Sequence, residues 1–385
     1  MLSLSAVTGF FFAFRLALSF LFFQSNPRLG TTVNLSVSVV LLFAALIARA
    51  GDFHFSLRTL RSNPVIRWLI LYLIATGASV LWTQAESPVI AAGYWFGMVM
   101  DVVTALLLLS GSEFDRTSDL ILSGFVSGTL VVAAVAWMSP TLPDLRIGNT
   151  EFLHPNNLGL EFGLAFLIAQ RLASEQLIYR IAAIILGLSA LRSLSKTAII
   201  ALVITEAIYL VRTSRLSKAA KLRVAALAGV ILVAFSGLFF AYVDIYANEG
   251  NSPETLTGRT AIWATSILMS FEHPWLGHGI YSFRALVPAF GTFEPWHAHN
   301  EFLQQFFELG LLGVVITAAL YLALFRMARR DRCNRLSETA MLLVVFTLIR
   351  GLADTLVFGL SLPLWLFALL ACNLSRSYTA APEAA

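Results

Sequence analysis

Stretches of about 17 to 23 mostly apolar residues recur along nearly the whole chain, and a stretch of that length crosses a lipid bilayer as one α-helix. A soluble fold is excluded, because 58% of the 385 residues are hydrophobic, only 12% are charged and the mean hydropathy is +0.79. The sequence therefore predicts an all-α, polytopic membrane protein that forms a single integral membrane domain, residues 1–385. We place twelve membrane-spanning helices at residues 4–24, 31–48, 65–82, 90–110, 119–138, 157–174, 178–194, 196–212, 223–244, 309–326, 336–357 and 359–376.

The basic residues indicate how these helices are oriented. Eighteen of the 26 Lys and Arg residues fall in loops that follow even-numbered helices or in the tail, and basic loops tend to stay on the cytoplasmic side of a membrane. We therefore expect the N- and C-termini to be cytoplasmic. The net charge of +4 reflects this topology, and nothing else in the chain favours a nucleic-acid partner.

One long polar loop, residues 245–308, separates the ninth and tenth helices and is predicted to form an extracytoplasmic subdomain. Apolar residues at helical spacing predict a short helix over Arg259–Phe271. A second short helix is expected to begin at Asn300, a residue that caps helices well. Its aromatic residues share one face and its acids and amides the other. We expect this helix to lie along the membrane surface, before the chain turns inward at Gly310 and Gly313.

Polar residues that can move protons gather at the end of this loop, in the stretch His297-Ala298-His299-Asn300. Imidazole groups titrate near neutral pH, so they can act as general bases. A loop histidine is also commonly just solvated or bonded to a helix end. The residues alone leave both explanations open.

Three motifs in this region resemble the signature of O-antigen ligases and the related O-antigen and exopolysaccharide polymerases. In chain order they are Gly258-Arg259-Thr260-Ala261-Ile262-Trp263, then Pro274-Trp275-Leu276-Gly277-His278-Gly279, then His299-Asn300 followed by Gly310 and Gly313. Two weaker similarities lie upstream, at His154-Pro155-Asn156-Asn157-Leu158-Gly159 and Ser195-Lys196-Thr197-Ala198. The related region is thus predicted to span residues 147–326, and its Ser-Lys-Thr form is closest to the exopolysaccharide polymerases.

The resemblance implies a GT-C-like glycosyltransferase in a bacterial inner membrane, surrounded by membrane lipids, with its active site facing the periplasm. It implies that a glycan moves from a polyprenyl-diphosphate donor to a sugar hydroxyl of a lipid-anchored acceptor. Polysaccharide polymerisation and O-antigen ligation both fit this description. Either reaction needs a base for the acceptor hydroxyl and a positive environment for the leaving diphosphate.

The resemblance also implies roles for particular residues. We expect His299 to be the base, His297 to support it, and Asn300 to orient it or to cap the following helix. The diphosphate is expected to bind a set of three cations: Arg259, Lys196 and Arg284.

Lys196 stands where many members of the family have Arg, and it lacks the bidentate fork that suits phosphate oxygens. The outer loops contain no Asp-x-Asp pair of carboxylates for a divalent metal. We therefore expect a metal-independent reaction without a cofactor.

Several of the remaining polar and aromatic residues have a structural explanation as well as a functional one. His154 and Asn156 either contact substrate or satisfy the free N–H groups at a helix start. Trp263 either contacts substrate or supports the site. The aromatic side chains of the loop either stack on sugar rings or lie at the membrane interface by default; they are Trp263, Trp275, Tyr281 and Trp296.

Charged residues within the apolar stretches are expected to form internal ion pairs; they are Arg15, Glu206, and Arg350 with Asp354. Twelve helices with intramembrane charges such as Asp101, Glu161 and Glu206 also suit an alternative function, a secondary transporter or a flippase for lipid-linked glycans. Transporters are commonly built from repeated halves, and this chain shows no internal repeat and is divided unequally by its long loop. A transporter needs its charges near the membrane midplane, whereas a transferase needs them at the outer surface.

Overall fold

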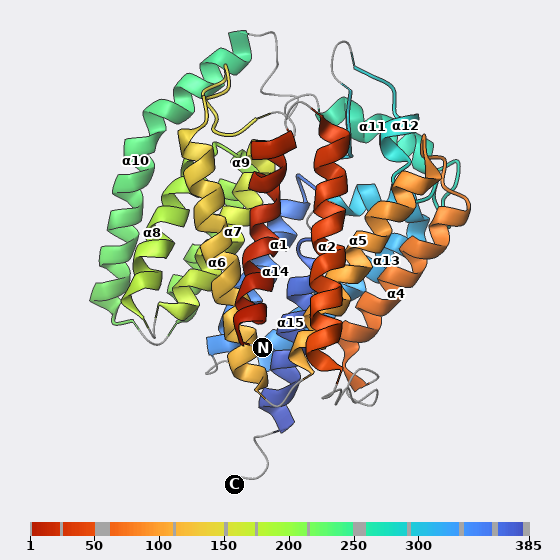
Figure 1. Ribbon diagram of the computed structural model, residues 1–385. Helices are drawn as coiled ribbons and strands as arrows, with labels where there is room; N and C mark the ends of the chain where they lie inside the picture. Colours follow the sequence, from red (N-terminus) through yellow and green to blue (C-terminus); the bar gives the residue numbers. More distant parts are fainter. Residues whose placement is uncertain are drawn as a thin grey trace.

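The protein is a bundle of helices (Figure 1). The computed structural model describes residues 2–23, 26–50, 62–110, 113–149, 153–173, 176–213, 216–248, 259–290, 294–330, 335–355 and 361–379, and helices are the regular elements in these ranges. In chain order they are α1 (Leu2–Phe23), α2 (Pro27–Arg49), α4 (Pro64–Ala78), the 3-10 helix η1 (Ser79–Leu81), α5 (Pro88–Leu109), α6 (Phe114–Met138), α7 (Pro155–Leu172), α8 (Leu177–Arg192), α9 (Lys196–Arg212), α10 (Lys218–Asn248), α11 (Arg259–Ser270), α12 (Phe283–Leu286), α13 (Glu301–Arg330), α14 (Arg335–Gly351) and α15 (Leu364–Thr379).

The predicted all-α polytopic class agrees with these helices. Seven segments among the described residues are long and apolar enough to cross a membrane: Leu4–Phe22, Leu29–Arg49, Pro64–Leu81, Pro88–Leu109, Phe114–Met138, Lys218–Tyr242 and Glu301–Arg330. Each of the twelve predicted spans overlaps one helix, but two boundaries near the C-terminus were wrong. The α14 helix ends at Gly351 rather than at residue 357, and α15 begins at Leu364 rather than at residue 359.

Four helices begin in the same way, with a polar capping residue followed by proline. The caps are Asn26, Asn63, Ser87 and His154, and each accepts a hydrogen bond from a backbone N–H of the first turn. Proline suits the next position because its missing N–H would be unpaired there in any case. These dipeptides explain locally why α2, α4, α5 and α7 start where they do.

Small residues and one buried ion pair hold the N-terminal half together. Side chains larger than glycine at Gly9 and Gly124 would overlap the backbone of the facing helix, so α1 and α6 lie in direct backbone contact. Arg15 in α1 forms an ion pair of 2.8 Å with Asp101 in α5, and both side chains are fully buried. The expected ion pair of Arg15 is confirmed. Glu206, in contrast, accepts a hydrogen bond of 3.0 Å from the Gln170 amide.

The short helices α11 and α12 lie at the end of the bundle opposite to the two termini (Figure 1). The α11 helix agrees with the helix predicted after residue 258, which itself lies outside the described residues. The expected turn at Gly310 is also present, because the backbone there is not helical and α13 is kinked. The turn that the sequence predicts at Gly310 is therefore present as a kink within α13.

The first part of α13 turns its polar face toward the protein. Its polar face is not turned to water, because four of its side chains are 3% exposed or less: Glu301, Gln304, Gln305 and Glu308. The Gln305 amide donates to the Tyr72 hydroxyl of α4 at 3.2 Å, and Gln304 donates to Glu308 at 2.9 Å. The polar stripe is satisfied by protein partners, so this face of the helix packs against the rest of the protein.

Candidate active site

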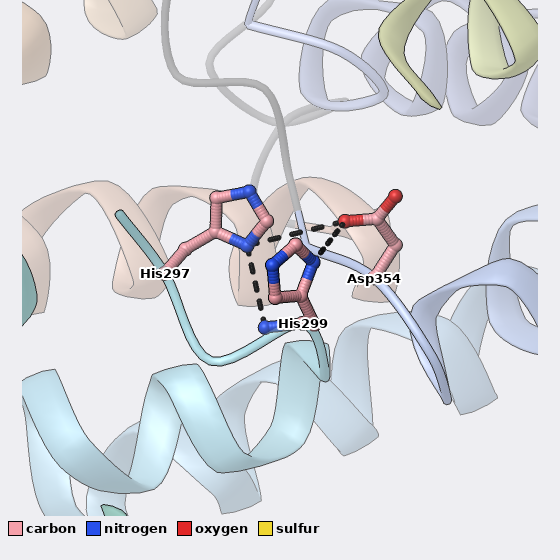
Figure 2. A group of neighbouring side chains, drawn as sticks. All are labelled: His297, His299 and Asp354. Carbon is pink, nitrogen blue, oxygen red and sulfur yellow. Dashed lines mark hydrogen bonds and ion pairs between the residues drawn. The ribbon is translucent and has the colours of Figure 1, made fainter. Parts of the chain in front are cut away.

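Four segments that are far apart in the sequence converge beside α11 and α12. They are the start of α7, the start of α9, the loop before α13 and the residues that follow α14. The loop contributes His297 and His299, and the segment after α14 contributes Asp354. Figure 2 shows the two imidazole rings and the carboxylate turned toward one another.

His299 and Asp354 form the closest contact between the histidines and the carboxylate. Nδ1 of His299 lies 3.6 Å from Oδ1 of Asp354, and the side chains are 14% and 2% exposed. This separation is longer than a hydrogen bond, but a small rotation of the ring would close it. Across the described residues, Nε2 of His299 has no hydrogen-bond partner, so it is the ring nitrogen that is left for a substrate.

Asp354 is held in place and kept ionised by its surroundings. The Arg350 guanidinium donates to Oδ2 at 2.9 Å, and the backbone N–H of Thr355 donates to Oδ1 at 3.0 Å. Burial alone would raise the pKa of the Asp354 carboxyl, but the adjacent Arg350 charge and the His299 contact hold that pKa well below its usual range. The expected ion pair of Arg350 and Asp354 is confirmed, and it lies in the site.

His297 occupies a different environment from His299. Its Nδ1 accepts a hydrogen bond of 3.3 Å from the His299 backbone N–H and lies 4.0 Å from Oδ1 of Asp354. Burial and the neighbouring His299 hold the pKa of His297 well below its usual range. A neutral His297 can keep accepting this hydrogen bond, and the contact shapes the loop that carries His299.

Protein groups on both sides fix the loop backbone between the two histidines. The Trp263 indole of α11 donates to the Ala298 carbonyl at 2.8 Å, and the buried Gln304 accepts from the Ala298 N–H at 2.7 Å. Asn300 accepts from the Leu303 N–H at 3.0 Å and donates to the Leu352 carbonyl at 2.9 Å. Asn300 therefore caps α13 and ties it to the end of α14, and Trp263 supports the loop.

The two glycine motifs lie against each other at the kink of α13. Gly277 and Gly310 both have positive φ angles, of 64° and 65°, which favour glycine. A Cβ atom at Gly310 would overlap the backbone of Trp275, and one at Gly277 would overlap the backbone of Glu308. Both glycines are therefore required by the same close approach of two backbone segments.

The start of α7 connects this cluster to the rest of the site. His154 caps α7, and Asn156 accepts a hydrogen bond of 3.1 Å from the Ser195 hydroxyl, while Arg350 reaches the Asn156 carbonyl at 3.5 Å. Burial, and then the charge of Arg146, lower the pKa of His154 to about 4. Both His154 and Asn156 thus have a structural role in this state of the protein.

Three cations surround the start of α9. Lys196 lies 5.0 Å from the ring centre of Tyr242, Arg146 lies 5.7 Å from the same ring, and the charges of Arg259 and Arg146 both act on the Lys196 ammonium. Arg146 also pairs with Asp144 at 2.5 Å. His154 experiences the charges of Arg146, Asp354 and His299, so both the cations and the His–Asp cluster act on it.

Arg284 takes a different position from the other predicted cations. Its guanidinium lies 4.1 Å from the ring centre of Trp296, and it interacts with the Tyr281 hydroxyl. The sequence prediction grouped Arg284 with Lys196 and Arg259. In the structure it is part of an aromatic cluster that adjoins the histidine loop.

Backbone strain is concentrated in the segments that form the site. Five non-glycine residues among those described have positive φ angles, and four of them lie in or next to the segments above: Leu145, Leu194, Tyr281 and His299. The φ angle of His299 is 49°. Such conformations cost free energy and cluster at functional sites, so the strain at His299 supports a functional role for this residue.

The sequence analysis assigned no specific site role to Asp354, Arg350 or Arg146, which the structure places next to predicted site residues. The signal was present for the first two, because an Asp four residues after an Arg near the end of an apolar stretch is unusual. The predicted helix runs to residue 357, so the sequence places Arg350 and Asp354 as an ion pair inside that helix. Arg146 lies in a short connection whose partners are distant in the sequence, so nothing in its neighbours indicated its position.

The same cluster has the donor types of a metal site. The nearest nitrogen or oxygen atoms of His297, His299 and Asp354 all lie within 4.8 Å of one another. Zinc takes such ligands, but the other oxygen of the Asp354 carboxylate already binds the Arg350 guanidinium, whose positive charge opposes a divalent cation. The arrangement therefore suits an imidazole base paired with a carboxylate better than a metal ion.

Comparison with known proteins gives two kinds of match. Residues 181–318 match a family model described as O-antigen ligase. A Pseudomonas aeruginosa protein named O-antigen ligase is 30% identical over 131 residues, which cover 32% of this chain and 30% of that protein. The exopolysaccharide production protein ExoQ of Rhizobium meliloti is 25% identical over 348 residues, covering 82% of this chain and 76% of ExoQ. The chain thus spans less than a third of the first relative and about three quarters of the second.

Proposed function

We propose, on the premise that residues 181–318 match the O-antigen ligase family, that this chain is a polysaccharide polymerase or ligase. The match confirms the resemblance and supports a membrane enzyme that transfers glycans. The donor is a glycan on a polyprenyl diphosphate, and the acceptor is a sugar hydroxyl of a second lipid-anchored molecule. The reaction takes place on the periplasmic face of a bacterial inner membrane. All twelve long helices span this membrane, in a GT-C-like arrangement.

The observation that carries the proposal is the His299–Asp354 pair. The acceptor hydroxyl attacks C1 of the donor sugar, the bond from C1 to the diphosphate oxygen breaks, and the hydroxyl proton passes to Nε2 of His299. Asp354 faces Nδ1 at 3.6 Å, so it favours the tautomer that leaves Nε2 unprotonated. The ionised carboxylate also stabilises the imidazolium ion that forms.

The cations at the start of α9 supply the second requirement. Lys196 and Arg259 bind the departing diphosphate, and Arg146 joins them because it lies 5.7 Å from the same Tyr242 ring that Lys196 contacts at 5.0 Å. Fixed cations can stabilise this leaving group without a metal ion, so the reaction is metal-independent. His297 supports the loop and does not itself react.

The test is the change His299→Ala in the full chain, with turnover measured in membranes from a strain that lacks its own activity. EDTA is present throughout the assay. We expect the variant to insert normally and to lose glycan transfer by about 100-fold or more, because a general base is removed. The wild-type enzyme is expected to stay active in EDTA.

The matched control is His273→Ala, which removes an exposed histidine of the same loop region. This control should transfer glycan at the wild-type rate. Full turnover by a well-expressed His299→Ala variant would overturn the base assignment. Complete loss of wild-type activity in EDTA, restored by a divalent metal, would overturn metal independence.

A further inference from the structure

An aromatic and guanidinium cluster lies directly beside the histidine loop. Trp296, the residue before His297, is 53% exposed, and the exposed Arg284 stacks on its ring with 4.1 Å between guanidinium carbon and ring centre. A large indole that is half exposed beside the His299–Asp354 pair is a surface where a ligand can make contact. The cluster adjoins the reaction centre without belonging to it.

The protein holds this cluster in a defined geometry. Arg284 interacts with the Tyr281 hydroxyl, and the Tyr281 ring stacks on Tyr94 with 4.7 Å between ring centres. The backbone N–H of Tyr281 donates to the buried Glu308 at 2.9 Å, and the φ angle of Tyr281 is 63°. Strained backbone conformations cluster at functional sites, and a buried carboxylate holds Tyr281 in this one. The strain therefore supports a functional role for the position of the Tyr281 side chain.

The chemistry of the cluster indicates its ligand. An exposed indole face packs on the C–H face of a pyranose ring, because both surfaces are apolar and flat while their edges are polar. A guanidinium group binds carboxylates through two parallel hydrogen bonds, which a neutral sugar cannot accept with the same strength. Arg284 contacts Trp296 and Tyr281, whereas Lys196 contacts Tyr242, so the two cations have different aromatic partners.

We propose that Trp296 and Arg284 form a subsite for an acidic sugar, one that bears a carboxylate, next to the sugar that reacts at His299. The inference rests on the proposed function and deepens it, since it names the class of glycan that the site prefers. Trp296 supplies the stacking surface and Arg284 recognises the carboxylate, while Tyr281 and Tyr94 position the guanidinium. The subsite acts on affinity and not on the transfer step.

The test measures binding rather than turnover. The full chain is purified in nanodiscs and titrated with a trisaccharide of glucuronic acid and, separately, with the glucose trisaccharide of the same linkage. We expect the wild-type protein to bind the acidic trisaccharide about tenfold more tightly. Arg284→Gln should remove this preference, and Trp296→Ala should weaken the binding of both sugars by about tenfold, whereas Trp296→Phe should retain most of it.

Two controls separate the subsite from other effects. Trp275→Ala removes another exposed tryptophan, 70% exposed, and should leave both affinities unchanged. His273→Ala removes an exposed histidine outside the site and should bind the sugars like the wild-type protein. Equal wild-type affinity for the two trisaccharides, no binding of either, or wild-type affinity in the Trp296→Ala and Arg284→Gln variants would each overturn the proposal. None of these results would change the turnover test of His299.

Discussion

At the scale of single residues, the groups of the site set the orientation and the ionisation of one another. His299 receives its orientation from Asp354, and Asp354 stays ionised because Arg350 lies beside it in a buried position. His297 receives the hydrogen bond of the His299 backbone. The reactive imidazole is therefore one member of a connected set.

Removal of the Asp354 charge tests this connection. In Asp354→Asn, the carboxylate can no longer favour the Nδ1-protonated tautomer of His299 or stabilise its imidazolium form. We expect kcat to fall by about tenfold or more, with the KM for the lipid-linked donor nearly unchanged. Steady-state kinetics in detergent with varied donor measure both constants.

The control is Asp101→Asn, which breaks the other fully buried Arg–Asp pair, that of Arg15. It should lower the thermal stability of the protein while the folded fraction keeps its kcat. If Asp354→Asn changes only stability, or raises KM at constant kcat, Asp354 does not position the base.

At the scale of elements, helix starts and one kink bring the site together. The His154 cap begins α7 at the edge of the site, and the Gly310 kink allows α13 to pass from the histidine loop into the bundle. The first two turns of α13 bury polar side chains that hold the loop, such as Gln304. These local features decide where the loop is placed.

The cap predicts a dependence of stability on pH. The pKa of His154 is about 4 in the folded protein and its ordinary value is 6.5, so the unfolded chain binds the extra proton first as the pH falls. The contribution of neutral His154 to the free energy of unfolding is therefore fully present above pH 6.5 and is lost progressively toward pH 4. Its upper limit is on the order of 3 kcal/mol. Thermal unfolding in detergent across this range measures it.

The variant His154→Asn keeps a capping side chain but has no titrating group, because asparagine caps helices well. We expect its Tm to fall less steeply than that of the wild-type protein between pH 6.5 and pH 4. The same slope in both proteins would show that His154 is not the source of the dependence.

The kink at Gly310 predicts that replacing this glycine strongly lowers the stability of the protein. In Gly310→Ala the new Cβ would overlap the Trp275 backbone, and the φ angle of 65° is unfavourable for alanine. We expect a loss of stability of about 2 kcal/mol or more, together with loss of turnover, since the backbone of α13, which follows the histidine loop, must shift.

Gly237 in α10 is the matched glycine, since a Cβ atom there would meet no other atom within 4 Å. Gly237→Ala should retain the wild-type stability and activity, because alanine is the better helix former. Expression, Tm and turnover of the two variants are compared side by side. Equal behaviour of both would show that the kink tolerates a side chain.

At the scale of the whole molecule, orientation decides whether the site can meet a periplasmic substrate. Figure 1 places the two termini at one end of the bundle and α11 and α12 at the other. With cytoplasmic termini, the His–Asp cluster faces the periplasm. The buried Arg15–Asp101 pair lies within the bundle and fits a structural role.

Cysteine labelling tests this orientation. In a chain whose two native cysteines, Cys333 and Cys372, are replaced, Trp275→Cys or Arg223→Cys is introduced; both positions are exposed. We expect an impermeant maleimide to label residue 275 in intact spheroplasts and residue 223 only after permeabilisation. The reverse pattern would place the site in the cytoplasm.

The sequence by itself determined that the protein is helical and embedded in a membrane, and nearly where each helix lies. The reason is local: the free energy of moving an apolar stretch into lipid, and the capping of a helix start, depend on neighbouring residues. The motifs also indicated His299, Lys196 and Arg259. None of this required knowledge of which helices touch.

Only the tertiary structure decided which residues meet. Asp354 follows His299 by 55 positions, yet their side chains lie 3.6 Å apart because the capping Asn300 binds the end of α14. Arg284, predicted to bind the diphosphate, stacks on Trp296, and the polar face of α13 is buried in the protein. Such contacts depend on how helices distant in the sequence pack, and an apolar or polar pattern along one helix does not specify its neighbour.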